Sequence, residues 1–112
     1  MARLSTHVLD TSRGRPAVGL AVDLHVCAGG QRRFLGTAAT DAQGRLLLGD
    51  DLPGGVYELV FHAGGYFRAA GVKLSDPPFL DDVVIRFGIS GAENYHVPLL
   101  LSPYGYSAYR GS

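Results

Sequence analysis

The stretch Asn94–Ser112 reads NYHVPLLLSPYGYSAYRGS and predicts two strands that fold back on each other. Residue types alternate over Tyr95–Leu101, which is the pattern of a strand with two different faces. One face carries Tyr95, Val97, Leu99 and Leu101, and the other carries His96, Pro98 and Leu100. Ser102–Gly105 is turn sequence, because proline presets φ and glycine tolerates positive φ. Tyr106–Arg110 then forms a second short strand, which makes a hairpin.

Two features of this hairpin point beyond a single chain. Pro98 cannot donate a ladder hydrogen bond, so its strand is expected at a sheet edge or locally broken. The face that carries His96 and Pro98 also carries Leu100, which argues against simple exposure to water. A partner surface would account for both features, and another copy of the same chain is the simplest candidate.

The rest of the chain predicts an all-β domain over residues 1–112 with turn sequences between short strands. The segment between Gly64 and Gly71 is expected to make one short helix, and Pro77-Pro78 excludes regular structure from the loop that follows. Such spacing indicates a β-sandwich of about eight short strands. The predicted strands are Leu4–Leu9, Leu20–Cys27, Arg32–Thr40, Arg45–Leu48, Val56–Ala63, Asp82–Ser90, Tyr95–Leu101 and Tyr106–Arg110.

Composition narrows the possible functions. The 112 residues include ten basic and ten acidic side chains, so no net charge favours nucleic acid or an anionic membrane as partner. No apolar run of about 18 residues predicts a transmembrane helix. The N-terminus lacks a secretory pattern, because His7 and Asp10 interrupt it. A single cysteine, Cys27, excludes an intrachain disulfide framework and suits a reducing compartment. A cytoplasmic location is predicted.

Three separated motifs, in order along nearly the whole chain, resemble one known family. The ending YHVPLLLSPYGYSAYRGS resembles the C-terminal signature of the transthyretin-related 5-hydroxyisourate hydrolases. The stretch LSTHVLDT with GRPA resembles the N-terminal signature of that family, and DAQGR (Asp41–Arg45) resembles its central one. Ala108 stands where that signature is expected to have threonine. The resemblance implies a transthyretin-like β-sandwich that assembles as a homotetramer.

The same resemblance implies a set of site residues. His7, Arg45 and His96 match positions of the family's catalytic site. Substrate-binding roles are implied for His7, Arg45, Tyr109, Arg110, Gly111 and Ser112. The family requires no cofactor and no metal, and this sequence has no His-x-x-x-His or paired-cysteine spacing. The site is expected in a channel between subunits.

The remaining candidate residues have no such support. His25 and His62 lie on the polar faces of predicted strands and are expected to be solvated. Cys27 has no motif around it and is expected to be a small packed side chain. No Gly-x-Ser-x-Gly nucleophile elbow occurs. The arginines outside the motifs are expected at the surface, namely Arg13, Arg15, Arg32, Arg33 and Arg68.

The family's substrate, 5-hydroxyisourate, is opened by hydrolysis of its six-membered ring, a reaction of the cyclic-amide class. His7 and His96 are expected to position and deprotonate the attacking water, since histidine titrates near neutral pH. The sequence does not decide which of the two is the base. Arg45 is expected to bind substrate oxygens and offset developing negative charge. Two alternatives are a transthyretin-type ligand carrier and a non-enzymatic interaction domain.

Overall fold

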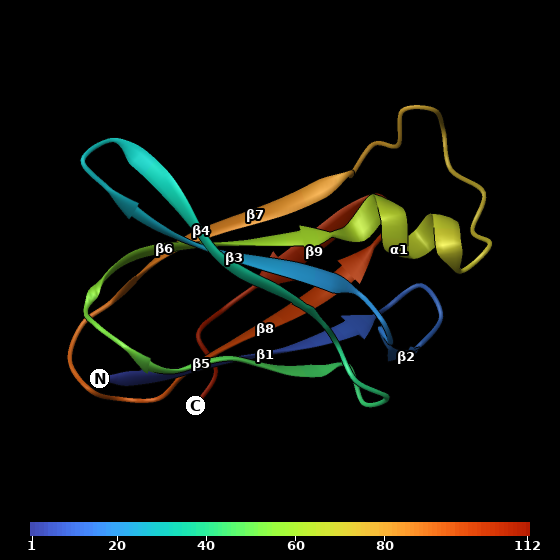
Figure 1. Cartoon of the computed structure of the whole chain (residues 1–112). Helices are drawn as coiled ribbons and strands as arrows, with labels where there is room; N and C mark the ends of the chain where they lie inside the picture. Colours follow the sequence, from blue (N-terminus) through green and yellow to red (C-terminus); the bar gives the residue numbers. More distant parts are fainter.

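Two β-sheets pack face to face and one short helix closes one end (Figure 1). The computed structural model describes all 112 residues, Met1–Ser112. The strands are β1 Ala2–Asp10, β2 Arg15–Pro16, β3 Ala21–Ala28, β4 Gln31–Ala39, β5 Arg45–Leu52, β6 Gly55–His62, β7 Asp82–Ile89, β8 Tyr95–Ser102 and β9 Gly105–Ala108, and the helix is α1 Ala63–Ala69. The predicted all-β sandwich with one short helix is therefore confirmed. The helix is seven residues long and could not span a bilayer.

The first sheet has the order β2-β1-β8-β9, and β5 pairs with β1 on the same side as β2. Strands β1 and β8 run parallel, whereas the other pairs of this sheet are antiparallel. The second sheet has the order β4-β3-β6-β7 and is antiparallel throughout. The N-terminal strand thus lies in the middle of the first sheet, directly beside the strand of the terminal hairpin.

The core lies between the two sheets and follows the alternation of the sequence. In β1, Leu4, Thr6 and Val8 are fully buried, whereas the residues between them are only half-buried or exposed. In β8, the buried set is Tyr95, Val97, Leu99 and Leu101, as the pattern predicts. Helix α1 inserts Tyr66 and Phe67 into the same core. Each central strand of the first sheet therefore has one core face and one outer face.

Pro98 was expected to place its strand at a sheet edge or to break the ladder locally, and the structure shows the local break. Strand β8 is not an edge strand, because β1 and β9 flank it. Its ladder with β9 runs from Ser102↔Gly105 to Leu99↔Ala108, stops, and resumes with the isolated bridge His96↔Gly111. The break falls at Pro98, which has no N–H to donate. The strand is locally broken, as predicted, and β9 ends at Ala108 rather than Arg110.

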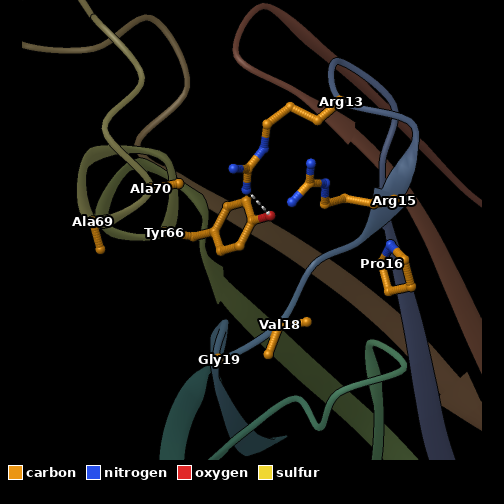
Figure 2. A pocket seen from close by; sticks show the side chains of 8 residues that line it. All are labelled: Arg13, Arg15, Pro16, Val18, Gly19, Tyr66, Ala69 and Ala70. Atoms are coloured by element: carbon orange, nitrogen blue, oxygen red, sulfur yellow. Dashed lines mark hydrogen bonds between the residues drawn. The ribbon is translucent and has the colours of Figure 1, made fainter.

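A polar network at the end of β1 joins the two sheets through helix α1. The carboxylate of Asp10 is fully buried and accepts hydrogen bonds from Ser12, Arg13 and the Tyr66 hydroxyl. Nη2 of Arg13 also donates to the Tyr66 hydroxyl at 2.7 Å (Figure 2). Arg13 is exposed, as predicted, but it neutralises a buried charge. Arg13, Arg15 and Tyr66 line one hollow on the surface (Figure 2). Arg15 pairs with no carboxylate.

Two of the histidines differ from the prediction of solvated side chains. His25 is only 9 % exposed, because the ring of Phe34 on the neighbouring strand lies edge-on to it at 5.5 Å. His62 is half-buried, and its two ring nitrogens hydrogen-bond the carboxylates of Asp23 and Asp82 at 2.9 and 3.0 Å. The prediction was wrong for His25 because alternation does not show which outer-face residues a neighbouring aromatic ring covers.

Candidate active site

The outer face of the first sheet brings three of the predicted site residues together. His7 lies opposite Arg45 in the antiparallel ladder between β1 and β5. On its other side β1 runs parallel to β8, where Ser5 is level with His96 and His7 with Pro98. Since Leu4, Thr6 and Val8 face the core, Ser5 and His7 face outward with their neighbours in the ladders. Segments at the start, middle and end of the chain therefore meet on this face.

The turn before β5 fixes the position of Arg45, the first residue of that strand. Oδ1 of Asp41 accepts the backbone N–H groups of Gln43 and Arg45 at 2.8 and 2.9 Å, which closes an Asx-type turn. Gly44 has φ of +76°, and a β-carbon there would lie 2.5 Å from the carbonyl oxygen of Val8. The same glycine accepts a hydrogen bond from the Val8 N–H at 2.9 Å. Only glycine allows this close approach, which sets Arg45 beside His7.

The ring of His96 is held from two sides. Its Nδ1 is 2.9 Å from Oγ of Ser5, and its backbone carbonyl accepts the N–H of Gly111 at 2.7 Å. A β-carbon at Gly111 would lie 2.9 Å from Cδ2 of His96 and 3.1 Å from Cγ of Pro98. Glycine is thus required for the chain end to pack against the imidazole. These contacts leave Nε2 as the ring nitrogen without a protein partner.

A cavity of about 560 Å³ opens on this face, and Arg45 and His96 are among the residues that line it. Its polar lining comprises Arg3, Ser5, Thr6, Asp41, Arg45, Asn94, His96 and Ser112. His7 borders this lining through its ladder contact with Arg45. A cavity of this size accommodates a bicyclic small molecule, and its lining offers both donors and acceptors to such a ligand.

The surroundings of His96 favour a neutral imidazole. Partial burial lowers the pKa of His96 below its ordinary value, and the nearby positive charges of His7 and Arg45 lower it further. The pKa of Asp41 is also lowered, mainly by the backbone N–H groups of Arg45 and Gln43. At neutral pH the site therefore combines an unprotonated imidazole, a guanidinium and a carboxylate one of whose oxygens is engaged in the turn.

Tyr109 and Arg110 lie apart from this group. Both line a second, smaller hollow of about 220 Å³ together with apolar residues of β7 and β8, among them Phe87 and Val97. The guanidinium of Arg110 lies over the ring of Tyr95 at 4.2 Å, and one of its nitrogens is 3.6 Å from a carboxylate oxygen of Glu93. Of the four terminal residues, Gly111 and Ser112 therefore meet the cavity or its histidine, whereas Tyr109 and Arg110 line the other hollow.

Five polar residues of the cavity lining were not predicted as site residues, namely Arg3, Ser5, Thr6, Asp41 and Asn94. Ser5 carries the hydroxyl that contacts His96, and no local pattern reveals it, because the contact depends on the pairing of strands 91 positions apart. Asp41 belongs to the central motif, and an aspartate two residues before a glutamine-glycine turn is a signal for an Asx turn. No cluster of three or more His, Cys, Asp or Glu side chains is arranged to hold a metal ion. Cys27 is a half-buried free thiol on β3.

Comparisons with known proteins agree with this arrangement. A family model described as HIUase/Transthyretin family matches residues 4–111. The chain is 59% identical over 115 residues to 5-hydroxyisourate hydrolase 2 of Rhizobium meliloti (strain 1021), covering 98% of this chain and 96% of that protein.

Two solved structures are similar over all or nearly all of their length. The 5-hydroxyisourate hydrolase of Klebsiella pneumoniae superposes with a TM-score of 0.84 at 38% identity, covering 100% of both chains. Sea bream transthyretin in complex with thyroxine superposes with a TM-score of 0.85 at 29% identity, covering 96% of this chain and 93% of that chain. The predicted transthyretin-like sandwich is confirmed.

Proposed function

This chain belongs to the HIUase/transthyretin family, and we propose that it hydrolyses 5-hydroxyisourate. The observation that carries the proposal is the pairing of β1 with both β5 and β8, which gathers His7, Arg45 and His96 beside one open cavity. The relatives from Rhizobium meliloti and Klebsiella pneumoniae carry the name of this activity. Hydrolysis of a cyclic amide needs a base for water and a positive group for the attacked carbonyl, and this face offers both.

In the proposed reaction, an imidazole removes a proton from water and the hydroxide oxygen bonds to a ring carbonyl carbon of the substrate. The carbon–nitrogen bond of the cyclic amide then breaks, the ring nitrogen receives a proton, and the carbonyl becomes a carboxylate. We assign the base to His96, because its lowered pKa keeps it unprotonated at neutral pH and no residue of the chain engages its Nε2. His7 orients the water or the substrate from the adjacent ladder position.

Arg45 serves as the substrate-binding and charge-stabilising group. It is exposed at the start of β5 and no carboxylate in the chain forms an ion pair with it, so its guanidinium is available to a ligand. A guanidinium donates paired hydrogen bonds to neighbouring oxygens and stabilises negative charge that develops on them. Gly111 and Ser112 hold the cavity's edge next to His96, and Tyr109 and Arg110 contact substrate only where a partner subunit brings them to the site.

We also propose that the active form is a homotetramer whose subunits meet over this face. Leu47 on β5 and Leu100 on β8 are 49 % and 38 % exposed on the outer face of the same sheet. Exposed apolar side chains on a sheet face are typical of interfaces between copies. A second copy would cover both leucines and close a cavity that one chain leaves open. Size-exclusion chromatography with light scattering checks the stoichiometry, and a fully active monomer would contradict this part of the proposal.

A coupled ultraviolet assay tests the activity. Urate oxidase generates 5-hydroxyisourate from urate in the cuvette, and its decay is followed with and without the protein. We expect faster decay with the intact chain and a loss of about 100-fold or more in kcat for His96→Ala, the range typical of a general base. Arg45→Gln should also lower the rate, and Arg15→Gln, which removes the same charge outside the site, is its matched control. Spontaneous decay in the presence of a folded wild-type tetramer would favour a ligand carrier instead.

A further inference from the structure

The hydroxyl of Ser5 is the only side-chain partner of the His96 ring within the chain. The distance from Oγ of Ser5 to Nδ1 of His96 is 2.9 Å, and the pair is partly buried. The contact crosses the parallel ladder between β1 and β8, in which the two residues are level. Both residues line the cavity. The hydroxyl therefore lies where it can decide which ring nitrogen of His96 carries a proton.

The backbone around Ser5 leaves this hydroxyl little freedom. Strand β1 is paired on both sides at this point, with Leu47 of β5 and with His96 of β8. The next residue, Thr6, is fully buried, and its hydroxyl donates to the carbonyl of Val97 at 2.7 Å. This second side-chain bond ties the same two strands together one residue further on. The hydroxyl of Ser5 is therefore held in position against the imidazole of His96 by the strands on both sides.

The other edges of the ring are also defined. The Cδ2 edge lies against Gly111, where a β-carbon would approach within 2.9 Å. With Nδ1 engaged by Ser5 and Cδ2 against the chain end, Nε2 is the nitrogen that no residue of the chain engages. Only Nε2 is therefore free to accept a proton from water.

The charges around the site favour one tautomer. Positively charged or protonatable groups that border the cavity come from two strands, with Arg3 and His7 on β1 and Arg45 on β5. The one acidic side chain in the lining, Asp41, already accepts two backbone N–H groups. Positive surroundings favour a lone pair over an N–H on Nε2, the ring nitrogen that no residue of the chain engages, so the proton of a neutral His96 belongs on Nδ1. A serine hydroxyl can accept that proton in a hydrogen bond.

We propose that Ser5 is a positioning residue: its hydroxyl oxygen accepts the Nδ1–H of His96 and holds the tautomer whose unprotonated Nε2 serves as the base. The inference rests on the proposed function for its effect on rate, but the tautomer itself is independent of substrate. No new bond forms at Ser5, and its own hydroxyl proton stays in place. The serine acts through the histidine and does not touch the water or the substrate.

Nitrogen NMR of the histidine ring is the decisive experiment. Long-range proton–nitrogen spectra of the full-length protein, labelled with 15N-histidine, distinguish a protonated from an unprotonated ring nitrogen, and His96→Gln identifies the signals of His96. We expect Nδ1 protonated and Nε2 unprotonated in the wild type at a pH where His96 is neutral. Ser5→Ala should give a mixture of tautomers, whereas Ser5→Thr should keep the wild-type pattern.

Activity gives a second readout that a merely structural role would not move in this way. On the high-pH plateau, where His96 is neutral in every variant, Ser5→Ala should lower kcat roughly tenfold, which corresponds to the loss of one hydrogen bond. KM should be unchanged and Ser5→Thr should restore the rate. Ser75→Ala is the matched control, because it also removes a serine hydroxyl with one intrachain hydrogen bond, to the carbonyl of Pro77, far from the cavity.

The outcomes separate the two proposals. A protonated Nε2 in the wild type, or the same tautomer in the wild type and Ser5→Ala, overturns the role of Ser5 whatever the activity. A tautomer change in Ser5→Ala together with a lower plateau rate supports it. A tautomer change in a protein with no hydrolase activity supports the role of Ser5 toward His96 and refutes the proposed substrate.

Discussion

Replacing Arg13 tests how much the buried Asp10 depends on a compensating charge. Nε of Arg13 donates to Oδ2 of Asp10 at 2.9 Å, and the side chain of Asp10 has no exposed surface, whereas that of Arg13 is 32% exposed. Removing one partner of a fully buried ion pair costs about 3–5 kcal/mol. Because Arg13 is partly solvated and Asp10 keeps its bonds from Ser12 and Tyr66, we expect Arg13→Gln to destabilise the fold by about 2–3 kcal/mol.

Urea unfolding at one fixed protein concentration measures this difference, since dissociation of an oligomer would otherwise change the midpoint. Arg15→Gln is the matched control. It removes the same charge from the same loop and the same hollow (Figure 2), but Arg15 pairs with no carboxylate. We expect it to change the free energy of unfolding by less than about 0.5 kcal/mol.

The pH dependence gives a further check on the cause. Burial opposes ionisation of Asp10, but hydrogen bonds from Ser12, Arg13 and Tyr66 outweigh it and lower the pKa of Asp10 below its ordinary value. A lowered carboxyl pKa stabilises the fold above the unfolded-state pKa of about 3.9, and this stabilisation is lost as the pH falls through the folded-state pKa. The difference in the free energy of unfolding between wild type and Arg13→Gln should therefore become smaller below about pH 4. Equal stability of Arg13→Gln and Arg15→Gln at pH 7 would refute the reasoning.

Two further predictions concern the site. Gly111→Ala places a β-carbon 2.9 Å from Cδ2 of His96. We therefore expect a loss of about tenfold or more in kcat, with an unchanged far-ultraviolet circular dichroism spectrum. Wild-type activity in this variant would show that the chain end moves aside freely. Arg45→Gln removes one of the positive charges that lower the pKa of His96, so an NMR titration should show the pKa of His96 rise toward its ordinary value of about 6.5. An unchanged pKa would mean that Arg45 does not contribute to the lowering.

The sequence predicts the fold well where alternation is strong. In β3, Leu20 and Cys27 bracket the predicted strand, and the observed strand Ala21–Ala28 differs by one residue at each end. The terminal hairpin and the short helix between Gly64 and Gly71 are also confirmed. The two-residue strand β2 was missed, because Arg15–Pro16 lies in a loop and pairs only through its contact with the end of β1.

The site is predicted less completely, for a physical reason. Motif resemblance names His7, Arg45 and His96, and the structure brings all three to one face. It does not bring Tyr109 and Arg110 there, although they are adjacent to Gly111 in sequence. Strand β9 ends at Ala108, and the chain pairs with β8 again only at Gly111, so Tyr109 and Arg110 lie in the gap between these two pairings. Sequence proximity to Gly111 therefore does not place them beside His96.

The same alternation makes the site inseparable from correct folding of β1. A slip of one residue in this strand would exchange the core face with the face that carries Ser5 and His7. Two buried polar side chains oppose such a slip, since Thr6 donates to the carbonyl of Val97 and Asp10 is held by a cluster of donors at the end of the strand. A slipped strand would leave both without partners, at a cost of about 1–3 kcal/mol or more for each. The buried network around Asp10 therefore specifies the register on which the contact between Ser5 and His96 depends, although it lies at the far end of β1 from that contact.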